Sequence, residues 1–346
     1  LFPYTTLFRS GDLVLKIDKN TLTFNQATDE LISLATATDN NYVWNSSSII
    51  TLDAGAGNNA INNTGTSVTV KSGTGNDTVT LSAEESENIL AIAANSGKDV
   101  VYNFFSSNAI KIDDNSMVKV SINKNDVVLK AGKGTVTLKD AAANTTTVTI
   151  LDSEDNVISS DIYNKDGKIL EDSTIELRED FSGTYNVPEE ISKVDGSNVK
   201  GKIKIVGYEW AYNELIGGKK GDTLEGSFID DTLTGGKGSD VFVYTGGNDL
   251  ITDYAKQDKI SIGSASLAVE DHSVDEDKNL ILSFGNSDSL TIADGAGEAI
   301  TLIKNGKKTT SFYESVGTFD KKKKSLVLSS TESIFNAADY SKLVTI

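Results

Sequence analysis

Short runs of apolar residues alternate with polar ones along most of the chain, with the period of two that is typical of half-buried β-strands. Val, Ile and Thr dominate these runs, and Asp-Gly and Asn-Gly turn pairs begin at Asp166 and Asn305. One segment also fits a short helix, because residues 82–85 (SAEE) have the form of a capping box before NILAIAA. The similarity of that segment to residues 241–244 favours a strand instead. The pattern therefore predicts an almost entirely β protein.

A nine-residue repeat marks the second half of the chain. An acidic or amide residue recurs at every ninth position, and an apolar residue follows each of them two places later. The two sets are Asn213, Asp222, Asp231, Asp240, Asp249 and Asp258, and Leu215, Leu224, Leu233, Phe242, Ile251 and Ile260. Glycines precede the acids, as in GGKKGD from Gly217 and GGKGSD from Gly235. This is the G-G-x-G-x-D-x-U-x nonapeptide, which is typical of stacked β-solenoids.

The spacing predicts how the acids would be placed and what they would bind. Two nine-residue units make one coil, so loops 18 residues apart stack on the same edge. Asp222 and Asp240 should share one edge, and Asp231 and Asp249 the other, with Asn213 before Asp231. Carboxylate and carbonyl oxygens would line the gaps between loops. Ca²⁺ takes about six to eight such ligands in irregular geometry, whereas Mg²⁺ demands a tighter octahedron, so the array predicts calcium sites.

An earlier and weaker array covers residues 41–101 with a period of 18. The segments ITLDAGAGNNAIN and VTVKSGTGNDTVT align so that Asn59 matches Asp77, and the preceding step falls on Asn41. After Asp77 the register slips by four residues. Because amides replace the acid at the other positions, a weak metal site at Asp77 stays open, but a coil without metal is favoured.

Longer duplications join the two arrays and define the predicted domains. GKDVVYNFFSSNAIKI parallels GNDLITDYAKQDKISI, and a hairpin-like pair of strands begins at Asp12, Asp126 and Asn279. The predicted parts are a sequencing-adapter-like start (1–10), the tail of a β module (11–35), a first module with degenerate repeats (36–155), a β spacer (156–207), a calcium-binding module (208–303) and a truncated next spacer (304–346). We expect the chain to be internal to a longer repeat protein.

Charge narrows the range of partners. The 346 residues include 50 Asp and Glu against 32 Lys and Arg, which gives a formal net charge of −18. Such a surface repels phosphate backbones and anionic lipid, so nucleic acid and membrane surfaces are poor partners, whereas multivalent cations are good ones. The absence of cysteine excludes disulfides and thiolate metal sites. No apolar stretch is long enough to span a bilayer.

The segment LIGGKKGDTLEGSFIDDTLTGGKGSDVFVYTGGNDLITDYAKQDKISI resembles the hemolysin-type calcium-binding repeats of repeats-in-toxin proteins. The resemblance implies an all-β chain in which parallel β-roll or β-solenoid segments carry antiparallel hairpins in tandem modules. It also implies calcium binding, an extracellular location and export by a type I secretion system.

Carried over residue by residue, the resemblance implies a set of metal ligands. They are Asp222, Asp240, Asp231 and Asp249, with Gly218, Gly235 and Gly238 lending carbonyl oxygens or the turn, and with Asn213 and Asp77 as weaker positions. Lys220 stands where the third glycine belongs, and Ser227 and Ile229 replace glycines in the next loop. These departures favour the edge of Asp222 and Asp240 over the opposite one.

Catalytic motifs are missing from the sequence, and we expect no enzyme activity. His272 is the only histidine, and neither H-E-x-x-H nor G-x-S-x-G occurs. Three functions remain open. The chain could be a calcium-dependent module of a large secreted or surface protein with an extracellular ligand, such as an adhesin. It could be the C-terminal calcium-binding and secretion region of an exported enzyme, or a solenoid without metal. Trp44 and Trp210 are expected to cap the ends of the solenoids.

Overall fold

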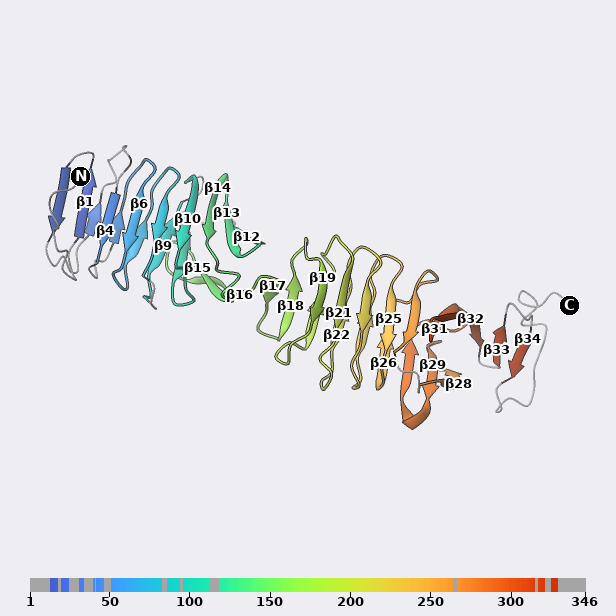
Figure 1. Ribbon diagram of the computed structural model, residues 1–346. Coiled ribbons are helices and arrows are strands. Elements are labelled where there is room, and N and C mark those ends of the chain that lie inside the picture. Colours follow the sequence, from blue (N-terminus) through green and yellow to red (C-terminus); the bar gives the residue numbers. More distant parts are fainter. Residues whose placement is uncertain are drawn as a thin grey trace. The chain divides into compact units, whose positions relative to one another are not determined.

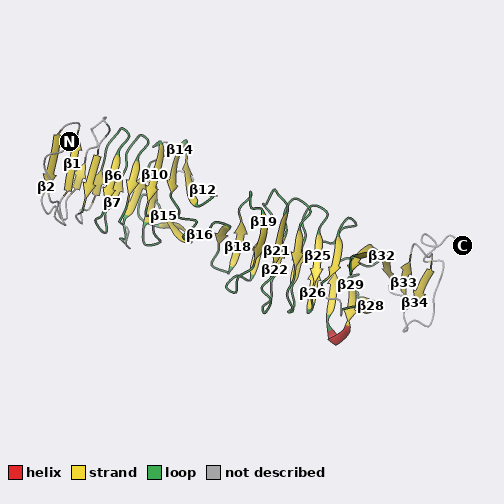
Figure 2. Cartoon of the chain, in the orientation of Figure 1, coloured by secondary structure: helices red, strands yellow, loops and turns green. Residues whose placement is uncertain are grey.

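The computed structural model describes residues 13–17, 20–24, 31–33, 40, 42–46, 51–82, 86–93, 96–112, 118–263, 267–314, 317–320 and 325–328. Two compact units make up the chain, Leu1–Ile169 and Leu170–Ile346. In each unit short strands stack into a β-solenoid with antiparallel hairpins, so the predicted all-β fold is confirmed (Figure 1). Within the described residues the one helical element is a single 3-10 turn, η1 (Gly285–Ser287) (Figure 2).

The first unit consists of two sheets that the chain visits in turn. Its strands are β1 (Leu13–Ile17), β2 (Asn20–Phe24), β3 (Leu31–Ser33), β4 (Tyr42–Asn45), β5 (Thr51–Asp53), β6 (Ala60–Asn63), β7 (Thr69–Lys71), β8 (Thr78–Thr80), β9 (Ile89–Ile92), β10 (Lys98–Tyr102), β11 (Ala109–Ile112), β12 (Val118–Asn123), β13 (Asp126–Ala131), β14 (Gly134–Leu138), β15 (Thr146–Leu151), β16 (Val157–Tyr163) and β17 (Gly167–Ile169). One sheet has the order β12-β13-β14-β10-β8-β6-β4-β1-β2, and the other runs β17-β16-β15-β11-β9-β7-β5-β3.

The second unit repeats this plan. Its strands are β18 (Thr174–Leu177), β19 (Gly183–Asn186), β20 (Lys193–Asp195), β21 (Ile203–Val206), β22 (Glu214–Ile216), β23 (Thr223–Glu225), β24 (Thr232–Thr234), β25 (Val241–Tyr244), β26 (Asn248–Ile251), β27 (Lys259–Ile262), β28 (Val269–Val274), β29 (Leu280–Phe284), β30 (Ser289–Ile292), β31 (Ala299–Lys304), β32 (Lys307–Glu314), β33 (Gly317–Asp320) and β34 (Ser325–Leu328). The sheet orders are β28-β29-β30-β26-β24-β22-β20-β18 and β19-β21-β23-β25-β27-β31-β32-β33-β34.

The apolar residue of each nonapeptide forms the core of the second solenoid, as the repeat predicts. Parallel pairing places Thr223 beside Val241 and Val241 beside Lys259, so neighbouring coils keep the register of 18 residues. The central residue of each three-residue strand then points inward. The six predicted positions are at most 1% exposed: Leu215, Leu224, Leu233, Phe242, Ile251 and Ile260.

The solenoid of the second unit begins earlier than the repeat predicts. β18 pairs in parallel with β20, and β20 with β22, although the loops between them lack the periodic acid. Buried Ile175 and Val194 continue the inward stack. The coil from Lys193 to Glu214 spans 21 residues, which hides it from a search at fixed period. Coils therefore precede Trp210, and this residue does not cap the solenoid end.

Hairpins are inserted where the sequence shows its duplications. β1–β2, β13–β14 and β29–β30 each pair antiparallel, which confirms the three predicted copies. The second strand of the latter two hairpins then joins the solenoid in parallel, β14 beside β10 and β30 beside β26. In the segment that also fitted a helix, Ile89–Ile92 forms strand β9. Residues 83–85, Asn41 and the predicted artefact at 1–10 lie outside the described residues.

The burial of Ile260 in the inward stack predicts how much a smaller side chain there would reduce stability. This side chain is fully buried between Phe242 and Leu302 in neighbouring strands, so Ile260→Val leaves a small void. We expect the free energy of unfolding to fall by about 0.5–1.5 kcal/mol. Urea denaturation should show a much smaller effect for Ser261→Ala at the adjacent outward position. Equal effects at the two positions would contradict the inward assignment.

Candidate metal centre

Three aspartates form a ladder along one edge of the second solenoid. Asp222, Asp240 and Asp258, called the first ladder below, precede strands of one sheet and are at most 2% exposed. Oδ1 of each accepts the backbone N–H from one coil earlier. The distances are 2.8 Å from Ile203 to Asp222, 2.7 Å from Asp222 to Asp240 and 2.8 Å from Asp240 to Asp258. The carboxylates therefore tie successive coils together, since hydrogen bonds to charged groups are among the stronger ones.

The opposite edge carries the second ladder, formed by Asn213, Asp231 and Asp249. Oδ1 of Asp231 accepts the Asn213 N–H at 2.7 Å, and Oδ1 of Asp249 accepts the Asp231 N–H at 2.9 Å. Asn213 also donates its side-chain amide to Asp231 Oδ1 at 2.9 Å. The structure thus places together the residues that were predicted to stack. They are Asp222 with Asp240 on one edge, and Asn213, Asp231 and Asp249 on the other. Their role as metal ligands stays a prediction.

The second carboxylate oxygens, Oδ2, differ along the ladders. In three of the loops Oδ2 accepts an N–H of its own turn: Gly218 donates to Asp222 at 2.6 Å, Ser227 to Asp231, and Ala255 to Asp258 at 2.7 Å. These oxygens have a partner without any cation.

Asp240 and Asp249 lack such a partner for Oδ2. The turn N–H of Gly236 is donated to Asp253 instead, at 2.7 Å, and no hydrogen bond from the described residues reaches Asp240 Oδ2. Oδ2 of Asp249 is buried and has no hydrogen-bond partner within the described chain. Buried polar oxygens without a partner are costly, and each one in a native structure needs an explanation.

Oδ2 of Asp231 and Oδ2 of Asp249 both lie close to Gly226. A Cβ added to Gly226 would lie 2.9 Å from Asp231 Oδ2 and 3.2 Å from Asp249 Oδ2, so both oxygens line the space that the missing side chain leaves. At the same position of the first ladder, a Cβ on Gly235 would lie 2.8 Å from Asp240 Oδ2. A side chain at either glycine would fill a space that carboxylate oxygens now border.

Burial leaves these carboxylates poorly solvated, which raises their pKa values. The pKa of Asp249 rises to about 8, first through burial and then through the neighbouring Asp231 charge. Burial, reinforced by the charges of Asp258 and Asp222, raises the pKa of Asp240 to about 6. Burial also raises the pKa of Asp222, Asp231 and Asp258. In the absence of a cation, Asp249 therefore carries a proton over much of the neutral range.

The glycines that the resemblance implicates have other partners. The Gly218 carbonyl accepts the Lys237 N–H at 3.0 Å, and the Gly238 carbonyl accepts the side-chain amide of Gln257 at 2.9 Å. Gly238 also has a φ of +143°, and a Cβ there would lie 2.3 Å from the backbone nitrogen of Gly221. Its lack of a side chain is thus required by close packing of the loops.

The first unit contains a shorter ladder at the predicted position. Asn59 donates its backbone N–H to Asp77 Oδ1 at 2.6 Å, and Asp77 donates its N–H to Asp99 Oδ1 at 3.0 Å. Asp77 is buried, its Oδ2 has no partner within the described residues, and burial raises its pKa to about 7. On the other edge Asn88 and Asn108 take the same place with neutral amides.

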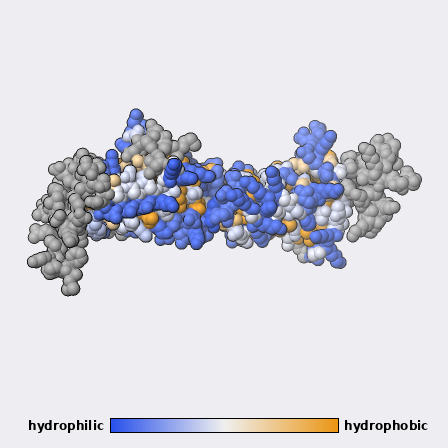
Figure 3. All heavy atoms as spheres, turned by 90° about the horizontal axis from the view of Figure 1, so that it is seen from above, coloured by the Kyte–Doolittle hydropathy of each residue, from blue (hydrophilic) through white to orange (hydrophobic). Residues whose placement is uncertain are grey.

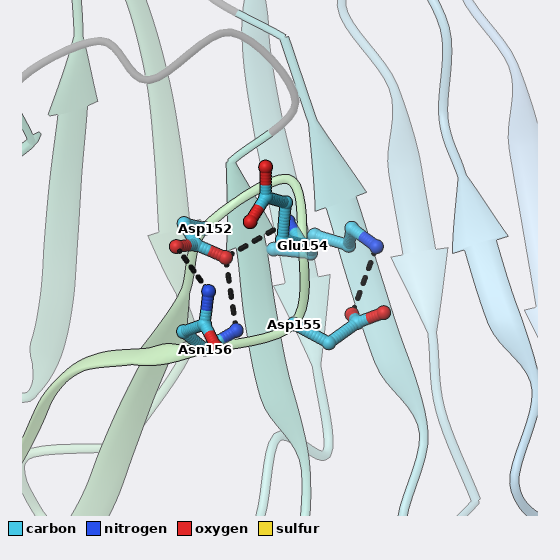
Figure 4. Close-up of polar contacts among 5 residues, drawn as sticks. Asp152, Glu154, Asp155 and Asn156 are labelled. Atoms are coloured by element: carbon cyan, nitrogen blue, oxygen red, sulfur yellow. Dashed lines mark hydrogen bonds and ion pairs between the residues drawn. The ribbon is translucent and has the colours of Figure 1, made fainter.

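Two acidic hairpin loops satisfy the oxygens of their first aspartate within the loop. In the loop of Figure 4, Asp152 Oδ1 accepts the N–H groups of Glu154 and Asn156, and Oδ2 accepts the Asn156 side chain at 2.9 Å. Asp155 pairs with Lys111 at 2.8 Å. Asp275 has the same three contacts in the loop between β28 and β29. These loops are stabilised turns and not candidate cation sites.

The candidate set from the sequence left out three acids, and one of them is Asp99, which accepts the Asp77 N–H in the first unit. Asp258 completes the first ladder, and the nine-residue period had already placed it there. Asp253 caps the N–H groups of Gly235 and Gly236, both at 2.7 Å. The one signal for Asp253 is its position 18 residues after Gly235, which the acid motif does not include.

No group of three or more His, Asp or Glu in the described part of the chain converges as a metal cluster. A cation at the ladders would therefore need backbone carbonyl oxygens besides two carboxylates. Among the same residues, no helix has the length and apolar character that crossing a bilayer requires.

No family of known proteins matches the sequence, and no curated protein matches it. A solved structure to which the chain is similar is the extracellular lipase LipA from Serratia marcescens, with 17% identity and a TM-score of 0.25. The match covers 70% of this chain and 38% of the lipase chain, so the chain spans less than two thirds of that protein.

Proposed function

We propose that the second solenoid binds calcium between its loops, and that the chain is a calcium-stabilised module of an exported extracellular repeat protein. The observation that carries this proposal is the buried, unpartnered Oδ2 of Asp249 beside Oδ2 of Asp231 at Gly226. Burial and the charge of Asp231 both disfavour the ionised form of Asp249 unless a counter-charge is present. A bound cation would supply that charge and the missing partner.

The donor set suits calcium better than other metals. Asp231 and Asp249 would hold the ion on the second ladder, and Asp240 with Asp222 would do so on the first. Carbonyl oxygens of the surrounding loops would complete each site. Hard oxygen donors select Ca²⁺ or Mg²⁺ over transition metals, and irregular loops with few carboxylates suit the larger, more adaptable Ca²⁺. The ion supplies only positive charge and coordination there.

Calcium binding would be coupled to folding. The ladder carboxylates come together only when coils stack, so the unfolded chain has no preformed site, and binding free energy adds to folding free energy. Extracellular calcium modules bind with dissociation constants of about 10⁻⁴–10⁻³ M. Such a module would stay loosely folded during export through a type I secretion system and become rigid outside the cell.

We assign this module a structural role and not a catalytic one. The sequence lacks a nucleophile motif, and its single His272 lies against the ring of Tyr313, with centroids 5.2 Å apart. Extracellular partners would then bind to surfaces that the stacked coils present.

Calorimetric titration tests the proposal. Calcium added to the metal-free chain should give saturable heat, and magnesium at the same concentration should give much less. Asp240→Asn and Asp249→Asn should each remove part of the calcium heat, whereas Asp277→Asn, in an exposed loop, should leave it unchanged. Equal heats for calcium and magnesium, or no loss in the two ladder variants, would contradict it.

A further inference from the structure

Exposed apolar side chains gather on two neighbouring loops of the second unit. The molecular face drawn in Figure 3 is mostly hydrophilic, and large exposed apolar residues are few. Trp210 and Tyr212 lie on the loop before β22, and Phe228 and Ile229 on the loop before β24; their exposed fractions are 67%, 49%, 55% and 41%. These four residues are called the aromatic edge below. Such a cluster on a hydrophilic surface marks an interaction site.

The solenoid repeat sets the geometry of the aromatic edge. Trp210, Phe228 and Gly246 occupy one loop position in three successive coils, each 18 residues apart. The rings of Trp210 and Phe228 have centroids 6.1 Å apart and are inclined by 46°. At the third coil the row of rings stops at Gly246. A Cβ on Gly246 would lie 3.8 Å from a ring carbon of Phe228 and 3.8 Å from Asp288 Oδ2. The ring of Phe228 and the carboxylate of Asp288 thus both lie next to the position where Gly246 has no side chain.

Charge differs sharply between the two edges of this solenoid. The loops 207–213, 226–231, 245–249 and 285–288, on the aromatic side, contain Glu and Asp residues but no Lys or Arg. The loops of the opposite edge carry the exposed Lys200, Lys202, Lys219, Lys220, Lys237 and Lys256. Asp230 and Asp288 are close enough to help raise the pKa of the buried Asp249, which shows how their charges concentrate here.

We infer that the aromatic edge is a docking surface for a basic peptide segment of a partner protein. An arginine or lysine side chain would lie over the rings of Phe228 or Trp210 while its cation faces Asp230 and Asp288. Cations bind to the faces of aromatic rings, and interfaces are enriched in Trp, Tyr, Phe and Arg. These loops contain no lysine that could neutralise the two carboxylates, although Oδ1 of Asp230 accepts the backbone N–H of Asn248 at 2.7 Å. A cation from outside can therefore approach Oδ2 of Asp230 and the carboxylate of Asp288. Rings inclined by 46° offer no flat shelf across both, which disfavours a stacked sugar.

The inference does not rest on calcium binding, although Asp230 and Asp288 also act electrostatically on Asp249. Trp210 and Phe228 are exposed and their rings lie beside each other, so their truncation should leave the calcium titration unchanged. Binding to the aromatic edge can therefore fail while the calcium sites stand, and the reverse also holds.

Fluorescence anisotropy with a labelled, amidated peptide of alternating arginine and glycine tests the inference. A peptide with citrulline in place of arginine has the same shape without the charge. We expect the full chain to bind the arginine peptide at least about fivefold more tightly than the citrulline peptide. Trp210→Ala and Phe228→Ala should each weaken arginine binding by at least about fivefold. Affinity should also fall as salt is raised.

Matched variants separate the aromatic edge from the general negative charge of the chain. Asp230→Asn with Asp288→Asn removes two charges at the edge, and Glu276→Gln with Asp277→Asn removes two exposed charges in the loop between β28 and β29, at the other end of strand β29 from Asp288. The first pair should weaken arginine binding clearly more than the second. Tyr102→Ala, at an exposed aromatic residue of the first unit, should have no effect.

Three results would overturn the inference. One is equal loss of affinity from the two charge pairs, and another is unchanged affinity in Trp210→Ala and Phe228→Ala. The third is concentration-dependent self-association of the wild type, by sedimentation velocity, that Phe228→Ala removes while peptide affinity stays the same. That outcome would assign the aromatic edge to a second copy of the chain.

Discussion

Without calcium, the free energy of unfolding should fall as the pH rises from about 4 to about 8. Asp77, Asp240 and Asp249 have folded-state pKa values of about 7, 6 and 8, above the ordinary value of 3.8. Between these limits the folded chain binds more protons than the unfolded chain, so stability decreases with rising pH. One pKa unit corresponds to about 1.4 kcal/mol, and we expect a total loss of roughly 2 kcal/mol or more.

Calcium should remove most of this dependence at the ladders of the second unit, because the ion replaces the proton as the counter-charge. Urea denaturation at about pH 5 and about pH 8.5, in chelator and in excess calcium, provides the comparison. Carboxylates with lowered pKa values, such as Asp126 beside Lys139, act in the opposite sense, but their contribution is lost only as the pH falls below the ordinary value of 3.8. If the free energy of unfolding without metal rose steadily from pH 5 to pH 8.5, the pKa values of the buried carboxylates would not be raised in the folded chain.

Asp249→Asn should change stability in opposite directions with and without calcium. Asparagine keeps an oxygen that can accept the Asp231 N–H, and it removes a buried charge beside Asp231. At pH 8 without calcium, the variant should therefore melt at the same temperature as the wild type or higher. With calcium it should lose the stabilisation of one site, which is about 3 kcal/mol when calcium is at a hundredfold excess over the dissociation constant.

Two comparisons make the Asp249 experiment specific. Asp240→Asn should also reduce the calcium-induced rise in melting temperature. Asp77→Asn should reduce it less, because Asn59, the residue one coil earlier, is already neutral. Loss of the calcium effect in Asp77→Asn, with Asp240→Asn and Asp249→Asn unaffected, would assign the metal to the first unit instead.

The periodic part of the fold could be predicted from the sequence because each nonapeptide encodes the same local structure. The inward positions such as Phe242, and the stacking of Asp222 with Asp240, follow from a period of 18 alone. The coil at β20 and β21 could not be found in this way. It spans 21 residues, and its inward Val194 follows no acid motif.

The sequence motif could not predict which of the two ladders has a carboxylate oxygen without a hydrogen-bond partner, because this depends on contacts within the loops. Glycine content favoured the edge of Asp222 and Asp240. In the structure Asp222 Oδ2 is satisfied by Gly218, whereas the orphaned oxygen belongs to Asp249 on the opposite edge. Which turn N–H reaches which carboxylate is a matter of loop geometry. The N–H four residues earlier reaches Asp222 and Asp231, whereas the equivalent N–H of Gly236 is donated to Asp253.

A crystal structure grown in calcium tests the central claim most directly. We predict an anomalous signal next to Gly226, with Oδ2 of both Asp231 and Asp249 about 2.3–2.6 Å from the ion. Loop carbonyl oxygens should complete the coordination. Density without an ion at this point, with Asp249 still lacking a partner for Oδ2 in saturating calcium, would contradict the account.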